Sequence, residues 1–187
     1  MEEKSDVIPR LISYLSALGM NIRISSYDDR IKAQKIAFLV GTLINEPLVE
    51  DFSFYIKGPY SHKLTTCYFE HYEDFNNKSN YELDEKEKIA IDKISKVLGN
   101  SLDAKTLEIV TSLLFLVKKS GLTCEEAELK LQKLKPHLPL EAIWQGSNLL
   151  KILLLTEKDK KTQMDAINKE MGPLDNVSNE ALDKSAE

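Results

Sequence analysis

The chain has 187 residues, 42% of them hydrophobic and 29% charged, so it is long enough for one domain with a buried core. Its 30 acidic and 25 basic side chains give a net charge of −5, which disfavours long-range attraction to nucleic acid or to an anionic membrane. Two cysteines are too few for a disulfide framework, and neither a secretory leader nor roughly 20 consecutive apolar residues are visible. We therefore expect a cytoplasmic protein that makes no membrane contact.

The first part of the chain predicts two helices. Pro9 stands where a first helical turn tolerates proline, and an apolar stripe follows it as far as Gly19. Ser26 and Asp29 form a capping pair in front of a second helix, expected from about residue 27 to 44. Apolar residues cover most of the circumference of this second helix, so we expect it to lie in the centre of the domain.

The next stretch predicts a strand, a turn and a third helix. Apolar and polar residues alternate from Phe52 to Lys57, which is the period of a strand with one buried face. Gly58-Pro59 should stop the strand because proline lacks an amide hydrogen, and Ser61 should cap the helix that follows. We expect the segment 81–83 to pair with this strand, since a lone strand leaves its ladder groups unpaired.

Boundary signals divide the rest of the chain into further helices. The expected spans are 61–75, a helix from a capping pair at Asp84 and Glu87 to Gly99, then 102–119, 123–134 and a last helix ending near 155. The predicted fold is mainly α, with six to eight helices and a minor two-stranded β-element, in a compact single domain over residues 5–156. Its strand-turn-helix unit is winged-helix-like. Residues 157–187 carry eight acidic and five basic side chains and are expected to be a mostly disordered tail.

Three runs of residues carry a family resemblance across about residues 8 to 150. They are Lys32-x-x-Lys35-Ile36-Ala37-Phe38-Leu39, Phe52-x-Phe54-Tyr55-x-x-Gly58-Pro59-Tyr60-Ser61-x-x-Leu64, and Leu113-Leu114-Phe115-Leu116 with Leu134-Lys135-Pro136. On these residues the chain resembles the YwgA-like proteins and, more distantly, the Panacea domain of SocA-like antitoxins. The resemblance implies a helical domain with a small β-element. For Panacea-like members it also implies neutralisation of a partner toxin, whereas for YwgA-like members it implies no particular activity.

Metal and catalytic sites are weakly indicated by the sequence. Cys67 and His71 share a helical face, but His62 is about 140° away from Cys67 at 3.6 residues per turn, and a closed zinc site needs four ligands. Cys67 and His71 also lack an orienting group for nucleophilic catalysis. We expect no metal, no cofactor and no enzymatic activity.

The sequence favours a protein-binding module of the antitoxin type. The alternative is a winged-helix-like DNA-binding regulator, although the third helix carries several acidic residues and few cations for phosphate contacts. Free amides at the start of that helix are a further candidate, as a docking site for an anion. Apolar residues around Trp144 could also pair two copies of the chain. The expected contact residues are Lys32, Lys35, Tyr55, Lys57, Gly58, Pro59, Tyr60, Ser61 and Lys63.

Overall fold

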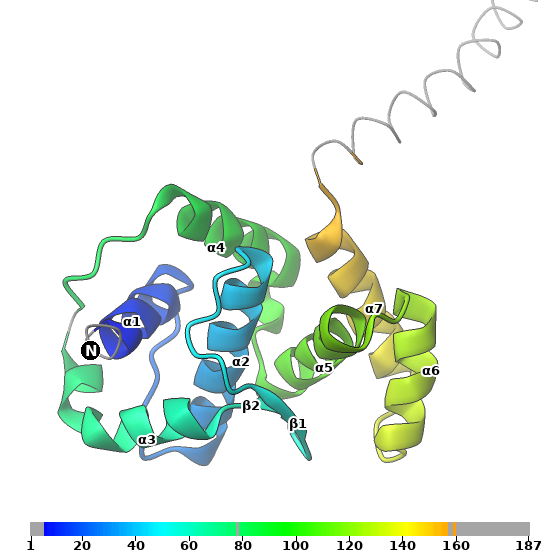
Figure 1. The fold of residues 1–187 in the computed structure, drawn as a ribbon, viewed down its shortest axis with the longest axis horizontal. Coiled ribbons are helices and arrows are strands. Elements are labelled where there is room, and N and C mark those ends of the chain that lie inside the picture. The colour runs from blue at the N-terminus through cyan, green and yellow to red at the C-terminus, as the bar shows by residue number, and fades with distance from the viewer. Residues whose placement is uncertain (1–5, 78, 157–158, 160–187) are drawn as a thin grey trace, which may run out of the picture. The chain divides into compact units, whose positions relative to one another are not determined.

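A computed structural model of the protein describes residues 6–77, 79–156 and 159, so the predicted tail lies outside the described residues except for Asp159. The described part is mainly helical with one small antiparallel sheet, which confirms the predicted fold class (Figure 1). Its elements are α1 (Val7–Ala17), α2 (Tyr27–Leu43), β1 (Ser53–Tyr55), β2 (Gly58–Tyr60), α3 (His62–Glu70), the 3-10 helix η1 (Tyr72–Asn76), α4 (Glu85–Leu98), the 3-10 helix η2 (Gly99–Ser101), α5 (Ala104–Ser120), α6 (Cys124–Leu134) and α7 (Leu140–Leu154).

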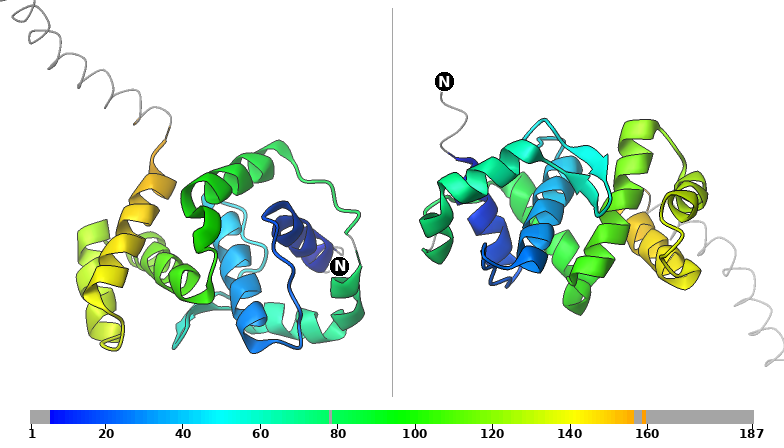
Figure 2. Two further views of the ribbon diagram at one scale, coloured as in Figure 1. Left: turned by 180° about the vertical axis from the view of Figure 1, so that it is seen from behind. Right: turned by 90° about the horizontal axis from the view of Figure 1, so that it is seen from below.

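Helix α2 is the centre of the domain, as its apolar circumference predicts. Every residue from 33 to 41 is buried, and the helix packs against α1 on one side and α5 on the other. All three ribbon views agree on this arrangement (Figures 1 and 2). Helices α6 and α7 pack on α5; at Gly146 of α7 an added Cβ would lie 2.4 Å from the Ile109 side chain of α5, which shows how closely the two helices approach.

The predicted helix caps are confirmed. The Ser26 side chain accepts a hydrogen bond from the backbone amide of Asp29, and the Ser61 side chain accepts one from Leu64. A full capping box starts α4, and another starts α6 at Thr123. These boundaries follow from contacts within four residues, which explains why a sequence alone indicates them. The third helix is shorter than predicted, because α3 ends at Glu70 and the chain continues as η1.

The predicted strand pairing is wrong. Strand β1 ends at Tyr55 and pairs with β2 in a hairpin, with Ser53 opposite Tyr60 and Tyr55 opposite Gly58. Gly58-Pro59 therefore begins the second strand instead of stopping the first. Proline is tolerated because both strands of a two-stranded sheet are edge strands. Ile56, expected on the inward face, lies in the turn and is 83% exposed.

The segment 81–83, the expected partner strand, is held by side chains of α1 instead. Ser13 donates to the carbonyl of Tyr81 at 2.9 Å. The Tyr81 hydroxyl lies 3.2 Å from both carboxylate oxygens of Glu87, at the start of α4. The backbone carbonyl of Tyr81 thus has a hydrogen-bond partner although the segment forms no strand.

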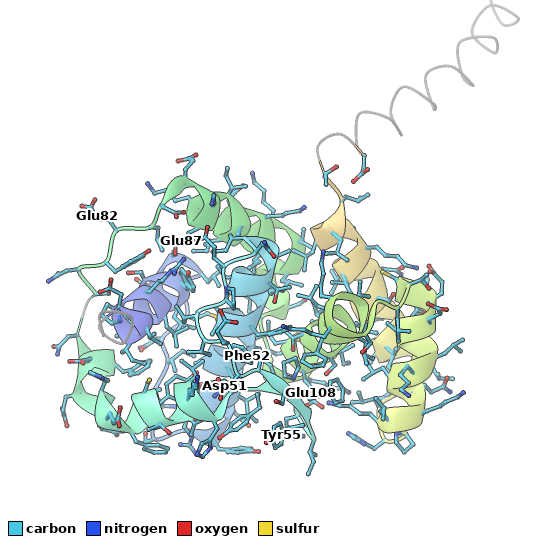
Figure 3. The ribbon with its side chains drawn as sticks, viewed as in Figure 1. Asp51, Phe52, Tyr55, Glu82, Glu87 and Glu108 are labelled. Atoms are coloured by element: carbon cyan, nitrogen blue, oxygen red, sulfur yellow. The ribbon has the colours of Figure 1, made fainter. Side chains whose placement is uncertain are left out.

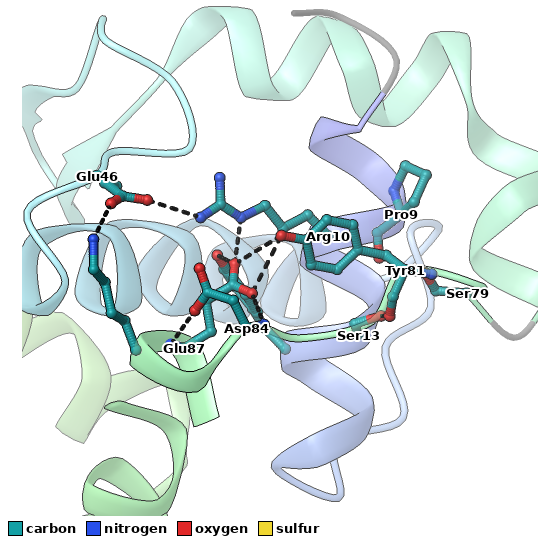
Figure 4. Close-up of polar contacts among 10 residues, drawn as sticks. Pro9, Arg10, Ser13, Glu46, Ser79, Tyr81, Asp84 and Glu87 are labelled. Carbon is teal, nitrogen blue, oxygen red and sulfur yellow. Dashed lines mark hydrogen bonds and ion pairs between the residues drawn. The ribbon is translucent and has the colours of Figure 1, made fainter. Parts of the chain in front are cut away.

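Glu87 joins α1 to α4 through a buried carboxylate (Figure 4). It accepts hydrogen bonds from Arg10 Nε, from the Tyr14 hydroxyl at 2.6 Å and from the backbone amide of Asp84 at 2.8 Å. Burial alone would raise the pKa of Glu87, but the hydrogen bonds from Tyr14, the Asp84 amide and Arg10 outweigh it and lower this pKa. The carboxylate is therefore charged and fully coordinated inside the protein.

We expect Glu87→Gln to lower the free energy of unfolding by about 3 kcal/mol, because it leaves Arg10 without its buried charge partner. Urea denaturation of the variant and of the unaltered protein measures this difference in the free energy of unfolding. Glu46→Gln is the matched control, since Glu46 also pairs with Arg10 but is 45% exposed, and it should cost less than about 1 kcal/mol. With its lowered pKa, Glu87 stabilises the fold above the carboxyl's unfolded pKa, and this contribution is lost as the pH falls through the folded value. Equal costs for the two variants would contradict this assignment.

Candidate functional site

A groove of about 510 Å³ lies between the first half of α2, the hairpin and α3, and we call it the aromatic groove. Aromatic and cationic side chains predominate in its lining, and no Asp, Glu, His or Cys is among the described residues that form it. Its lining residues are Tyr27, Arg30, Ile31, Gln34, Lys35, Tyr55, Ile56, Lys57, Gly58, Tyr60, Thr65 and Phe69.

The groove gathers large apolar side chains that face solvent. Tyr27 and Phe69 are 61% and 60% exposed, and Tyr55 and Ile56 at the hairpin are 55% and 83% exposed. Tyr55 also stacks edge-on against Tyr60 across the hairpin, with ring centroids 5.2 Å apart. Figure 3 labels Tyr55 at the hairpin. Exposed apolar residues clustered in one place, unlike scattered ones, mark interaction surfaces.

Arg30 organises the rim of the groove. Its guanidinium lies 5.8 Å from the ring centre of Tyr27 and 6.0 Å from that of Phe69. Its Nη1 donates to the carbonyl of Ile24 at 2.6 Å, which fixes the guanidinium to the backbone before α2. Two aromatic rings, one from α2 and one from α3, thus lie within about 6 Å of one cation.

Gln34 and Lys35, two neighbouring residues of α2, hold the hairpin and the start of α3 from below. The Gln34 amide accepts from the backbone amide of Ser61 at 3.0 Å and donates to the Ser61 carbonyl at 2.9 Å. Lys35 Nζ donates to the carbonyl of Pro59 at 2.6 Å. All three hydrogen bonds are buried, so they bind the main chain of this segment to the central helix.

Lys35 lies near two other lysines and one carboxylate, of which Lys135 and Glu108 are buried and Lys57 is exposed. Lys135 Nζ donates to Glu108 of α5, and Lys57 Nζ of the hairpin lies 3.7 Å from the other oxygen of Glu108. Burial and then the charge of Lys135 lower the pKa of Lys35 to about 7, although Glu108 opposes the shift. Burial likewise lowers the pKa of Lys135, against the effect of its hydrogen bond to Glu108. Two lysines whose pKa values are lowered thus lie near a single carboxylate, Glu108.

The predicted anion site at the start of α3 is already occupied by the chain itself. Asp51 accepts from the Ser61 hydroxyl and, at 3.0 Å, from the backbone amide of Lys63. Hydrogen bonds from this amide and from Ser61 lower the pKa of Asp51 despite partial burial, so the helix terminus is neutralised by a charged carboxylate. The Asp51 carboxylate thus takes the place that we expected an external anion to occupy.

Gly58 allows the hairpin to lie against α5. Its φ is +85°, and a Cβ at this position would lie 2.5 Å from the Ser112 hydroxyl. The Ser112 hydroxyl is buried and has no hydrogen-bond partner among the described residues. Only glycine combines this backbone angle with so close an approach.

The structure divides the expected contact residues into exposed and buried groups. Tyr55, Lys57 and Tyr60 line the aromatic groove, and Lys32 and Lys63 lie outside its lining. Four of the expected contact residues are buried and contribute to holding the hairpin: Lys35, Gly58, Pro59 and Ser61. Lys35 and Gly58 form part of the groove lining and Pro59 and Ser61 do not, and a direct contact with a partner stays a prediction at all four positions.

Sequence reasoning missed several residues of the site. Gln34 and Glu108 gave no signal, because their partners lie 27 residues away along the chain. Asp51 precedes the strand and resembles any loop aspartate until the chain folds back on it. Phe69 and Arg30 gave a weak signal, since an exposed aromatic residue and a cation become informative only when they converge.

Comparisons with known proteins give no information on the function of this groove. No protein-family model matches the chain, and searches of the curated proteins and of the solved structures find no significant match. Among the described residues, no group of three His, Cys, Asp or Glu side chains could hold a metal ion. None of the described helices combines the length and the apolar character that a membrane crossing requires.

We expect Gly58→Ala to cost about 2 kcal/mol or more in unfolding free energy, because it adds a clash with Ser112 to backbone strain. Gly19→Ala is the matched control, since its φ is +68° with no atom within 4 Å of the added Cβ, and it should show the strain alone. Ser112→Ala by itself should be nearly neutral, because it removes a hydroxyl without a partner. In the double variant, Ser112→Ala should recover the part of the Gly58→Ala cost that comes from the steric clash. If the double variant recovers no stability, the close approach of Gly58 to Ser112 is contradicted.

Replacing Lys35 by Met should have an effect on stability that depends on pH. Lys35 has a pKa of about 7 when folded and 10.5 as its ordinary value, so the unfolded chain binds more protons between these limits. The free energy of unfolding of the unaltered protein should therefore rise with pH across this window, by about 1 kcal/mol per pH unit relative to Lys35→Met. Denaturant melts of both proteins at several pH values measure the difference, and parallel curves would refute it.

Proposed function

We propose that this protein is a binding module whose aromatic groove receives a segment of one partner protein. The observation that supports the proposal is the convergence of Tyr27, Tyr55, Ile56 and Phe69 around Arg30. Tyrosine and arginine dominate the energetics of protein interfaces, and anchors held rigidly lose little entropy on binding. The buried hydrogen bonds from Gln34 and Lys35 supply that rigidity.

A binding role fits the groove better than catalysis does. General acid–base or nucleophilic chemistry needs titratable partners within hydrogen-bond reach of one another. The described lining includes no carboxylate, imidazole or thiol. The Lys35 amine, its most unusual group, donates to the Pro59 carbonyl.

A protein partner also fits better than DNA. Helix α3 holds the position of a recognition helix after the hairpin, yet Lys63 is its single lysine and it has no arginine. The cations of the groove are engaged as well, since Arg30 donates to backbone carbonyls and Lys57 faces Glu108. Affinity for DNA rests on cations that are free to meet phosphates.

The family resemblance suggests what the partner is. The Gly58-Pro59-Tyr60-Ser61 element belongs to the stretch that resembles Panacea-like antitoxins, and here it forms β2 and the start of α3 beside the groove. We therefore propose a cytoplasmic toxin, held inactive by the bound module, as the partner.

Site-specific cross-linking tests the proposed function. A photoreactive residue is placed at Ile56 in the groove or, as the matched control, at Trp144 of α7, which is 60% exposed and outside the groove. In the native host, Ile56 should give one prominent adduct that mass spectrometry identifies, and Trp144 should not give it. The identified protein is then purified, and its own activity is assayed with and without the module.

Binding of the identified partner to groove variants measures how much the groove contributes to the affinity. We expect Tyr55→Ala or Phe69→Ala to raise the dissociation constant by about 30-fold, because each removes a large apolar anchor. Trp144→Ala should leave it unchanged. An adduct from Trp144 alone would place the interface at α7, and an adduct with a second copy of the chain would indicate a homodimer. In a separate gel shift, retention of DNA with a steep salt dependence would favour the DNA-binding alternative instead.

A further inference from the structure

Beneath the groove, positive charge exceeds negative charge. Lys35, Lys57 and Lys135 surround Glu108, whose two oxygens already face Lys135 and Lys57. Lys35 has no carboxylate within ion-pair distance among the described residues. Lys35 is the member of the cluster that lines the groove while lacking a charged partner among the described residues.

The Lys35 amine also has donors left over. An ammonium group carries three N–H donors, and the structure gives Lys35 one acceptor, the Pro59 carbonyl at 2.6 Å. The side chain is 2% exposed, so bulk water is a poor substitute for the missing acceptors. Buried donors normally have partners, and one that faces a groove can obtain its partner from the occupant.

We propose that the occupant of the aromatic groove places a carboxylate on the Lys35 amine, so that the groove selects an aspartate or glutamate beside a large apolar residue. This inference rests on the proposed function and names the chemistry that the groove recognises. The groove lining supplies cations and apolar surface but no acid, which makes it complementary to such a segment.

A carboxylate fits this floor better than a phosphate. Phosphate sites combine several donors, typically an arginine fork or a series of backbone amides. The guanidinium of Arg30 is fixed to the carbonyl of Ile24, and the amide of Lys63 at the start of α3 is bonded to Asp51. The Lys35 ammonium carries one positive charge and has two N–H donors left after the Pro59 carbonyl, which match the single charge and the two acceptor oxygens of one carboxylate.

The proposed contact has a defined pH dependence. The groups that face Lys35 are Lys135, which disfavours its charge, and Glu108, which favours it, with Lys57 on the far side of Glu108. With its pKa at about 7 in the free protein, Lys35 must take up a proton to bind a carboxylate at higher pH. Affinity should fall as the pH rises above 7, by up to tenfold per pH unit.

Selection from a library of random peptides tests the inference without a known partner. Peptides are selected on the unaltered protein, and those whose binding Tyr55→Ala weakens are kept as groove binders. These should carry an aspartate or glutamate next to an apolar residue, and changing that residue to the amide should cost tenfold or more in affinity. Lys35→Met should lose the preference, whereas Lys63→Met, which alters a lysine outside the groove lining, should keep it.

Nuclear magnetic resonance of the Lys35 amine gives a second readout that needs no variant. Adding an acidic groove-binding peptide should raise the pKa of Lys35, and its amide analogue should not. Groove binders without an acidic residue, or an unchanged Lys35 pKa, would overturn the carboxylate inference and leave the proposed function standing. If no peptide depends on Tyr55, both fail.

Discussion

Two adjacent side chains of α2 determine where the hairpin lies. Gln34 bonds both main-chain groups of Ser61, and Lys35 bonds the carbonyl of Pro59, all out of contact with solvent. Because α2 is buried throughout this stretch, the hairpin is attached to a helix in the core of the domain. A loop fastened at its main chain to a rigid helix can present side chains in one fixed arrangement, which is what a recognition surface requires.

The hairpin therefore has a buried side and an exposed side, and the exposed side is the one that we propose for recognition. Gly58 and Pro59 are buried against α2 and α5, while Tyr55 and Ile56 are exposed to solvent. The cost of this arrangement is a lysine in the interior with a depressed pKa and a serine hydroxyl without a partner. Groups kept in the interior at such a cost often mark functional sites, and here they lie directly below the aromatic groove.

Local signals in the sequence predicted the helices well, and long-range contacts account for what it did not predict. The caps at Ser26, Ser61 and Asp84 involve residues three positions apart, so their spacing is readable without the fold. The hairpin was missed because its turn, Ile56-Lys57, lacks the Asn-Gly or Asp-Gly pair that marks tight turns. Gly58-Pro59 indicates a strand end in most sequences, and it was the contact of Gly58 with α5 that placed it within a strand.

The central claim is that the groove is formed before any partner arrives, because α2 holds Ser61 by its main chain. Hydrogen exchange of the Ser61 backbone amide in the isolated protein tests this most directly, since that amide donates to Gln34. The account predicts protection close to that of the buried amides of α2. Exchange as fast as in an open loop would contradict it and would mean that a partner assembles the groove.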